Sequence, residues 1–247
     1  MFDLDYEQVA KYLTEWLRKK ITEANKSGGV VGLSGGIDSA VTAALLKRSK
    51  GIEAFGLIMP CHSNEEDKKD AILVADTLNI EYDELDLSGN YDNLLNDFQK
   101  IIPGEDKLAE SNIKPRLRMI ALYYLAARKN YLVVGTDNWS ELYTGYFTKY
   151  GDGGIDLAPL GRLVKTEVRG LARYLGIPDK IIEREPSAGL WEEQTDEDEM
   201  GVSYEILDKY ILGEEVKDSH KSRIEELRAG AEHKLNTPPI PERKVFK

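Results

Sequence analysis

Short apolar runs alternate with amphipathic segments through the first half of the chain. Apolar runs with the length of buried strands cover residues 30–33, 54–59 and 131–134, and residues 80–87 alternate apolar and acidic residues as a half-buried strand would. Helical spacing or strongly helix-forming composition predicts helices over residues 5–25, 39–48, 65–78 and 115–129. Strands that alternate with helices over short links favour a parallel sheet covered by helices. We therefore expect an α/β fold with a parallel sheet of about five strands, whose carboxyl ends meet at one edge.

The pattern changes in the second half of the chain. Residues 145–162 are too rich in glycine for a regular element, and Thr166 is expected to cap a helix over residues 166–175. One helix and a loop are expected over residues 88–112, and further helices over residues 203–212 and 217–228. One domain spanning residues 1–247, with a mobile C-terminal cover segment, is the simplest organisation.

Composition limits the function further. The 247 residues are 41% apolar and 31% charged, which is typical of a globular protein. The net charge of −11 argues against broad binding to nucleic-acid phosphates. Cys61 is the only cysteine, so an intrachain disulfide and a Cys-rich metal site are excluded. No run approaches the roughly 20 apolar residues of a membrane helix, and residues 1–10 lack a signal-peptide core, so we expect a cytoplasmic protein with no membrane partner.

The clearest chemical motif joins the first predicted strand to the next helix. It consists of Gly32, Leu33, Ser34, Gly35, Gly36, Ile37, Asp38 and Ser39. Glycines let backbone N–H groups face a ligand, the helix start adds its positive dipole end, and the serine hydroxyls can donate to phosphate oxygens. Asp38 would repel phosphate unless a cation lay between them, which suggests Mg²⁺. The loop lacks the Gly-Lys-Ser/Thr ending of a Walker A loop, and the simplest alternative is an ordinary glycine turn.

The Ser-Gly-Gly-x-Asp-Ser pattern resembles the pyrophosphate loop of the N-type ATP pyrophosphatases, which cleave ATP between its α and β phosphates. Further segments resemble NAD synthetases in the same order, namely residues 112–119, 135–141, 144–154 and 194–197, together with Lys165, His233 and Lys234. The chain is identified as a member of that family. The ammonia-dependent type is expected, because only 33 residues precede Ser34 and none shows the context of an amidase cysteine. The resemblance implies the Rossmann-like fold of the adenine nucleotide alpha hydrolases.

The same resemblance implies a ligase that amidates deamido-NAD⁺ to NAD⁺ in the last step of NAD biosynthesis. ATP would be the co-substrate and Mg²⁺ the cofactor. An acyl-adenylate would form, ammonia would attack it, and AMP and diphosphate would be released. Family members are homodimers, and the aromatic-rich helix that contains Tyr123 and Tyr124 is expected to contribute to the contact.

The resemblance also assigns roles to matching positions. The loop from Gly32 to Ser39 would hold the pyrophosphate, and Asp38 and Glu141 would bind Mg²⁺. Asp152 would deprotonate or guide ammonium. ATP would also contact Thr136, Lys165 and Ser187, the last of which stands where the family usually has threonine. Deamido-NAD⁺ would contact Arg116, Lys149, Asp156, His233 and Lys234.

Other interpretations of the same residues stay open at this point. Isolated basic residues such as Arg116 and Lys165 are usually solvated charges, and Glu141 alone would suit a helix surface. The acidic residues 192–199 form either a solvated face or a cover that becomes ordered over ATP. A GMP synthetase, a tRNA-thiolating enzyme or a non-catalytic nucleotide-binding regulator would share the loop. Pyrophosphate release that requires both deamido-NAD⁺ and ammonia would separate NAD synthesis from all three.

Overall fold

The computed structural model describes residues 4–187 and 195–243, and within them four parallel strands form one sheet. The strands are β1 (Gly28–Leu33), β2 (Glu53–Ile58), β3 (Glu81–Glu84) and β4 (Tyr131–Val133), in the order β3-β2-β1-β4. The predicted parallel sheet is confirmed, but it has four strands where about five were expected. Beyond β4, Val134 makes a single parallel bridge with Leu157 at the position of a fifth strand. The glycine-rich chain before Leu157 favours turns over a longer strand.

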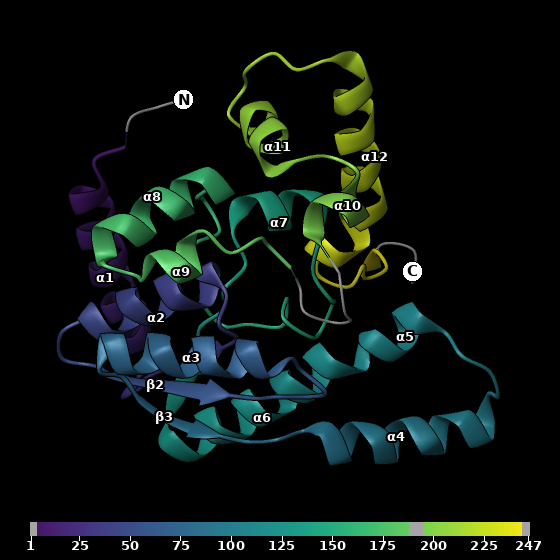
Figure 1. The fold of residues 1–247 in the computed structure, drawn as a ribbon, viewed down its shortest axis with the longest axis horizontal. Coiled ribbons are helices and arrows are strands. Elements are labelled where there is room, and N and C mark those ends of the chain that lie inside the picture. Colours follow the sequence, from purple (N-terminus) through teal and green to yellow (C-terminus); the bar gives the residue numbers. More distant parts are fainter. Residues whose placement is uncertain (1–3, 188–194, 244–247) are drawn as a thin grey trace.

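Helices cover both faces of the sheet (Figure 1). On one face, α2 (Ile37–Arg48) and α3 (Glu65–Leu78) pack against the strands, and α1 (Tyr6–Glu23), α8 (Lys165–Leu175) and α9 (Asp179–Ile182) complete the same core outside them. The other face packs against α6 (Ile113–Lys129), beside which lies α4 (Ser88–Ile101). Because α2 is buried on nearly all sides, its sequence is apolar without a polar stripe. Within the described residues, no helix has the length and apolar character that crossing a membrane requires.

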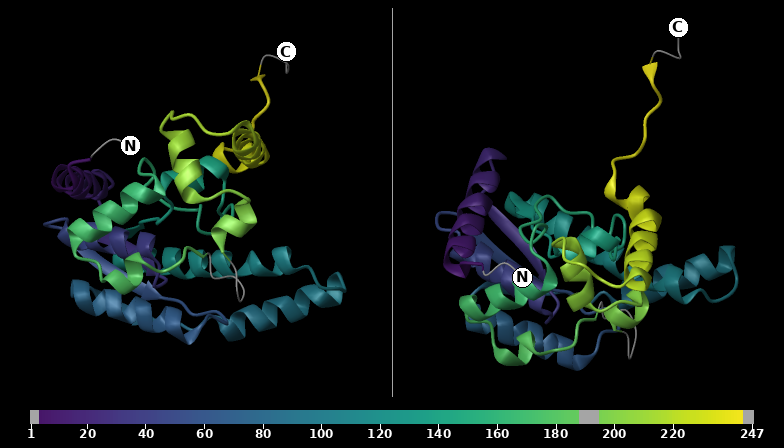
Figure 2. Two further views of the ribbon diagram at one scale, coloured as in Figure 1. Left: turned by 45° about the horizontal axis from the view of Figure 1, so that its top comes forward. Right: turned by 90° about the horizontal axis from the view of Figure 1, so that it is seen from above.

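A third group of helices packs beside the sheet rather than on it. It comprises α7 (Trp139–Thr144), α10 (Asp196–Met200), α11 (Tyr204–Ile211) and α12 (Asp218–Leu235), with Met200, Tyr204, Leu207 and Ile224 in its own small core. Figure 1 and the left view of Figure 2 place α11 and α12 on the far side of the molecule from α4 and α5 (Lys107–Ser111). At Gly145, which ends α7 with a φ of +67°, a Cβ atom would lie 2.0 Å from the Cβ of Ala231 on α12. Glycine therefore permits the close approach of these two helices.

Several helix boundaries differ from the sequence prediction because tertiary contacts decide them. Thr166 does not cap α8, because the helix begins one residue earlier, at Lys165. The backbone N–H of Thr166 instead donates to Asp208 Oδ2 at 2.8 Å. The last helix continues seven residues past its predicted end at 228 and reaches Leu235, since Ala231 is buried against α7. The first helix after the loop begins at Ile37 rather than Ser39. Residues 88–112 contain two helices, α4 and α5, instead of one.

Asp208 joins three helices and supplies a test of the packing. It is fully buried on α11, where its carboxylate accepts hydrogen bonds from Ser140 Oγ at 2.6 Å and from the backbone N–H of Thr166 at 2.8 Å. Replacing Asp208 with alanine is expected to lower the free energy of unfolding by about 2–4 kcal/mol, because both donors would be left buried and unsatisfied. Urea titration measures the change.

The matched control for this variant is Glu205→Ala on the same helix. Glu205 forms an exposed ion pair with Lys209, so its loss is expected to cost less than about 0.5 kcal/mol. Equal losses for the two variants would show that Asp208 does not hold the helices together.

Candidate active site

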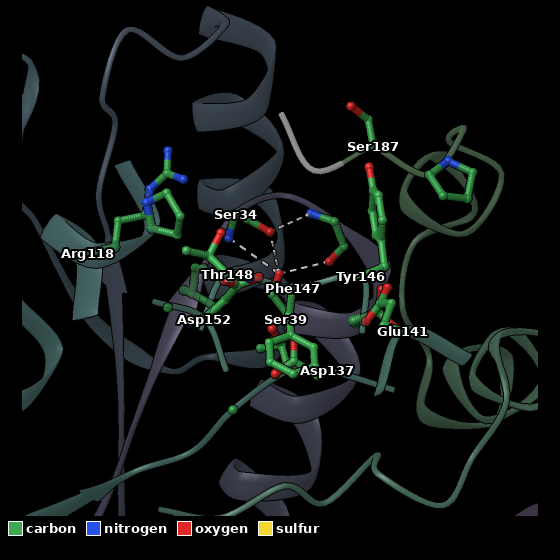
Figure 3. Close-up of a pocket in the computed structure, with 18 of the residues that line it drawn as sticks. Ser34, Ser39, Arg118, Asp137, Glu141, Tyr146, Phe147, Thr148, Asp152 and Ser187 are labelled. Atoms are coloured by element: carbon green, nitrogen blue, oxygen red, sulfur yellow. Dashed lines mark hydrogen bonds between the residues drawn. The ribbon is translucent and has the colours of Figure 1, made fainter. Parts of the chain in front are cut away.

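A cavity of about 660 Å³ lies at the carboxyl ends of β1, β2 and β4. Its walls come from the loops after these strands, from α6, α7 and α8, and from the chain near Ser187 (Figure 3). The strand ends of a parallel sheet are where the backbone leaves regular pairing, so loops and helix N-termini converge there. This places the loop that follows β1 in the wall of the cavity at the strand ends.

The loop after β1 has the geometry of an anion site. Gly35 has a φ of +82°, and a Cβ atom there would lie 2.6 Å from the carbonyl oxygen of Asp67 on α3. Ser39 Oγ donates to the carbonyl of Gly36 at 2.8 Å, and the hydroxyls of Ser34 and Ser39 lie 3.2 Å apart. These bonds fix the loop where α2 begins, so the free N–H groups of the first helical turn lie at the cavity.

Three charged side chains from separate elements meet beside this loop, and Lys165 is buried while the two acids are largely covered. Lys165 Nζ lies 2.6 Å from Asp38 Oδ2 and 3.2 Å from Glu141 Oε1. The three side chains are 3%, 16% and 13% exposed, respectively. Asn138 fixes the two acids, since its Nδ2 donates to Asp38 Oδ1 at 3.0 Å and its backbone N–H donates to Glu141 Oε2 at 3.0 Å. The structure therefore brings together Asp38, Glu141 and Lys165, which we call the ion triad.

Burial and charge shape the ionisation of the triad. Burial alone would lower the pKa of Lys165, but Asp38 and Glu141 outweigh it and raise the pKa, so the ammonium stays charged. Burial raises the pKa of Glu141, and Lys165 opposes that shift. Nearby, burial also raises the pKa of Asp196, whose carboxylate accepts a hydrogen bond from Tyr204 Oη at 2.9 Å. The acids outnumber the single ammonium, so the site attracts further positive charge.

The donor set at the triad fits a hard cation. Mg²⁺ takes oxygen ligands and is commonly held by one or two carboxylates together with substrate phosphates. Within residues 4–187 and 195–243, no group of three or more His, Cys, Asp or Glu side chains is arranged to hold a metal alone. Asp38 and Glu141 suit the shared mode, in which phosphate oxygens and water complete the coordination.

The other predicted site residues divide into two groups. Thr136, Asp152, Ser187 and Lys234 line the cavity. Asp152 Oδ1 accepts the backbone N–H of Thr148 at 2.8 Å, and burial raises its pKa. Lys234 Nζ donates to the carbonyls of Gly145 and Phe147, each at 2.9 Å.

Arg116, Lys149, Asp156 and His233 do not line the cavity in this chain. Arg116 donates to the backbone carbonyl of Lys149, and Lys149 Nζ donates to that of His233, so the three form an exposed chain of contacts. Asp156 instead accepts the backbone N–H of Val133 at 2.8 Å and the hydroxyl of Tyr123 at 3.1 Å. The predicted cover over residues 192–199 lies partly outside the described residues, and its last part begins α10.

Sequence reasoning assigned no role to several charged residues of the cavity wall, among them Asp137 and Arg118. Asp137 is 5% exposed, and within the described chain its Oδ2 has no hydrogen-bond partner. Burial raises the pKa of Asp137 well above its usual range, with added repulsion from Asp152 and Glu141. Arg118 also lines the cavity. Both lie inside the family-like segments 135–141 and 112–119, which were the available signal.

Comparison with known proteins decides the family. The model of the NAD synthase family matches residues 9–238. This chain belongs to the NAD synthase family. The resemblance expected from the sequence is thereby confirmed, and so is the fold that it implied.

Curated members of the NAD synthase family match this chain over nearly its whole length. The NH₃-dependent NAD⁺ synthetase of Carboxydothermus hydrogenoformans is 50% identical over 239 residues, which cover 96% of this chain and 98% of that protein. That of Archaeoglobus fulgidus is 43% identical over 244 residues, with 96% and 97% covered.

Solved structures agree with these matches. An NMN synthetase from Francisella tularensis has 38% identity and a TM-score of 0.93, with 97% of this chain and 99% of that chain covered. The NH₃-dependent NAD synthetase of Campylobacter jejuni, in complex with nitrate, has 32% identity and a TM-score of 0.80, with 97% and 100% covered.

Replacing Lys165 with methionine tests the ion triad. Two buried carboxylates would lose their shared cation, so the free energy of unfolding is expected to fall by about 3–5 kcal/mol at pH 7. Burial already raises the pKa of Glu141 with Lys165 present, and the variant raises it further. A raised folded-state pKa means that protonation favours the folded form, so the variant should regain stability as the pH falls towards about 5.

Urea titrations at both pH values measure the loss in Lys165→Met. Lys209→Met, which removes an exposed ion pair on α11, is the control and should change the free energy by less than about 1 kcal/mol at either pH. A loss in Lys165→Met that does not depend on pH would contradict the account.

Proposed function

We propose that this protein is an NH₃-dependent NAD⁺ synthetase, which converts deamido-NAD⁺, ATP and ammonia into NAD⁺, AMP and diphosphate. The observation that carries the proposal is the glycine–serine loop and the ion triad in one cavity of an NAD synthase family member. The full-length matches to proteins named for this activity support the same choice of substrates.

The proposed reaction overcomes the poor reactivity of a carboxylate towards ammonia. An oxygen of the nicotinate carboxylate attacks the α-phosphorus of ATP, and the bond to the β-phosphate oxygen breaks. Diphosphate leaves onto the loop from Gly32 to Ser39, whose N–H groups and hydroxyls stabilise its charge. Ammonia then attacks the acyl-adenylate carbon, a proton is lost, and AMP departs as a stable leaving group.

Asp38 and Glu141 would hold Mg²⁺ against the phosphates of ATP. When bound, the ion would neutralise phosphate charge where diphosphate leaves. Lys165 would add a point charge on the same phosphates, since its ammonium already lies between the two acids. Thr136 and Ser187 would contact ATP from the cavity wall. Asp152 would receive or guide the proton of ammonium, for which its raised pKa is suited.

Deamido-NAD⁺ would contact Arg116, Lys149, Asp156, His233 and Lys234. Four of these five lie outside the cavity of the single chain, which supports a homodimer whose second copy completes the site. Arg116 shares one face of α6 with Ile120, Tyr123 and Tyr124, which are 67%, 39% and 68% exposed. Tyr123 contacts Asp156, so this apolar face adjoins a predicted substrate contact.

We propose in addition a single domain over residues 1–247, a cytoplasmic location and a cover segment that closes over ATP. The backbone N–H of Asp196 donates to the carbonyl of Pro186 at 3.2 Å, so the described residues on both sides of residues 188–194 meet at the cavity.

A second function is favoured by one observation. The Francisella tularensis structure with a TM-score of 0.93 is named an NMN synthetase. Such an enzyme would apply the same amidation to nicotinic acid mononucleotide, which has the same carboxylate but lacks the AMP half. The two functions therefore differ in the acceptor and not in the chemistry of the triad.

An assay with ATP and Mg²⁺ separates these functions. We expect diphosphate release that requires both deamido-NAD⁺ and ammonium, with glutamine unable to replace ammonium and with nicotinic acid mononucleotide a poorer acceptor. Chromatography of the nucleotides and a diphosphate assay measure the products.

Preference for the mononucleotide in this assay would replace the proposed function with NMN synthesis. Diphosphate release without an acceptor, or release of ADP and phosphate, would contradict both.

Replacing Tyr124 with glutamate tests the dimer. A charge buried at the contact of two apolar faces is costly, so the wild-type protein is expected to sediment as a dimer and Tyr124→Glu as a monomer. Tyr12→Glu is the matched control, because Tyr12 is 65% exposed on α1 and lies away from this face. Wild-type protein that sediments as a monomer at assay concentration would contradict the dimer.

A further inference from the structure

One of the cations that line the cavity, Arg118, belongs neither to the ion triad nor to another ion pair in the described residues. Arg118 lies on α6, and its Nε donates to the carbonyl of Met59 at 3.1 Å while its Nη2 donates to Ser63 Oγ at 3.3 Å. Both contacts are to the chain that follows β2. Figure 3 shows the guanidinium on the same side of the cavity as Ser34, Thr148 and Asp152, opposite Glu141 and Ser187.

Arg118 differs from the other basic residues of the cavity in its partners. Lys165 is held by two carboxylates and Lys234 by two carbonyls, whereas Arg184 pairs with Asp67 and Asp70. Arg118 forms no ion pair in the part of the chain that the structure describes, and both N–H groups on its Nη1 make no hydrogen bond there.

A guanidinium that is partly buried and forms no ion pair is costly. Burial lowers the pKa of Arg118, but the group stays protonated because its ordinary pKa is far above neutral. Removing such a charge from water is repaid only by an opposite charge or by several hydrogen bonds. Asp152 and Asp67 act on Arg118 only through their charge, without an ion pair. Because Arg118 lines a cavity that is proposed to hold an anionic substrate, an anion is the partner that suits its unused N–H groups.

The surroundings favour a carboxylate on an aromatic ring over a phosphate. Phe147 and Asp152 line the same cavity as Arg118, and the ring of Phe147 offers an apolar face there. The phosphates of ATP are already assigned to the loop after β1 and to the ion triad, which leaves the guanidinium of Arg118 for the acceptor carboxylate. A guanidinium fork matches the two oxygens of a carboxylate in its own plane.

We propose that Arg118 is a catalytic residue that binds the acceptor carboxylate and then the oxygen that remains on that carbon after adenylation. When ammonia nitrogen bonds to the carbon, the C=O electron pair moves onto this oxygen, and Arg118 stabilises the charge. The pair returns as the bond to the AMP oxygen breaks, and the nitrogen loses its proton to water. This assignment rests on the proposed function.

Binding of a matched ligand pair tests the assignment. Deamido-NAD⁺ and NAD⁺ differ only in carboxylate against carboxamide, so calorimetry with each ligand isolates the charge. We expect wild-type protein to bind deamido-NAD⁺ at least about tenfold more tightly, and Arg118→Met to lose that preference. Arg118→Lys, which keeps the charge without the fork, should retain part of it.

The control is Arg128→Met, an exposed arginine on the same helix, which should keep the full preference. Thermal melting of each variant reports folding separately. Equal weakening of both ligands in Arg118→Met would show a structural role, and weaker ATP binding with the preference intact would show a phosphate contact; either result overturns the assignment.

Wild-type turnover, measured beside the binding, keeps the two proposals distinguishable. Amide formation by the wild-type enzyme together with an unchanged preference in Arg118→Met removes the Arg118 assignment alone. Absence of amide formation removes the proposed function and, with it, the assignment that depends on it.

Discussion

One ammonium shared between two buried carboxylates determines how the functional edge of this protein is built. Lys165 at the start of α8 contacts Asp38 on α2 and Glu141 on α7. Lys165 and Asp38 are 127 positions apart in the sequence. Without the lysine, the removal of either ionised carboxylate from water would destabilise the folded protein. The triad therefore fixes three helix starts against one another, and the loop after β1 takes its position from that frame.

The same frame explains how a region of negative charge can hold a triphosphate. The acids attract a cation, while the first turn of α2 and the hydroxyls of Ser34 and Ser39 offer donors to phosphate. Anion and cation sites lie side by side, which suits a metal-bound nucleotide better than either ion alone. The likeness to both an NAD synthetase and an NMN synthetase is consistent with this arrangement, since both products require the same conversion of a carboxylate.

Patterns local in sequence could be predicted well. Apolar runs indicated β1, β2 and β4, because burial in a parallel sheet leaves an apolar composition, and alternation of apolar and acidic residues indicated the mostly exposed β3. The helical patterns indicated α1, α2, α3, α6 and α8, but not the short α9. The loop from Gly32 to Ser39 was recognisable because its chemistry lies in consecutive residues. The resemblance also identified the triad members before any contact between them was known.

Features decided by distant contacts could not be predicted from the sequence. The hydrogen bond from Thr166 to Asp208 replaces the expected cap, and the packing of Ala231 on Gly145 carries α12 past Gly230, which alone would disfavour a helix. Asp137 and Arg118 gave no separate signal, since the role of a charged residue in a cavity wall is recognised only from what surrounds it. Periodicity reports which face is buried and says little about which charges meet there.

The path of one oxygen atom tests the central claim most directly. Deamido-NAD⁺ labelled with ¹⁸O in its nicotinate carboxylate is converted with ATP and ammonium, and mass spectrometry measures the ¹⁸O content of AMP and diphosphate. If the carboxylate attacks the α-phosphorus while the loop receives diphosphate, one labelled oxygen appears in AMP and none in diphosphate. Label in a phosphate released with ADP, or AMP that carries no label, would contradict the account.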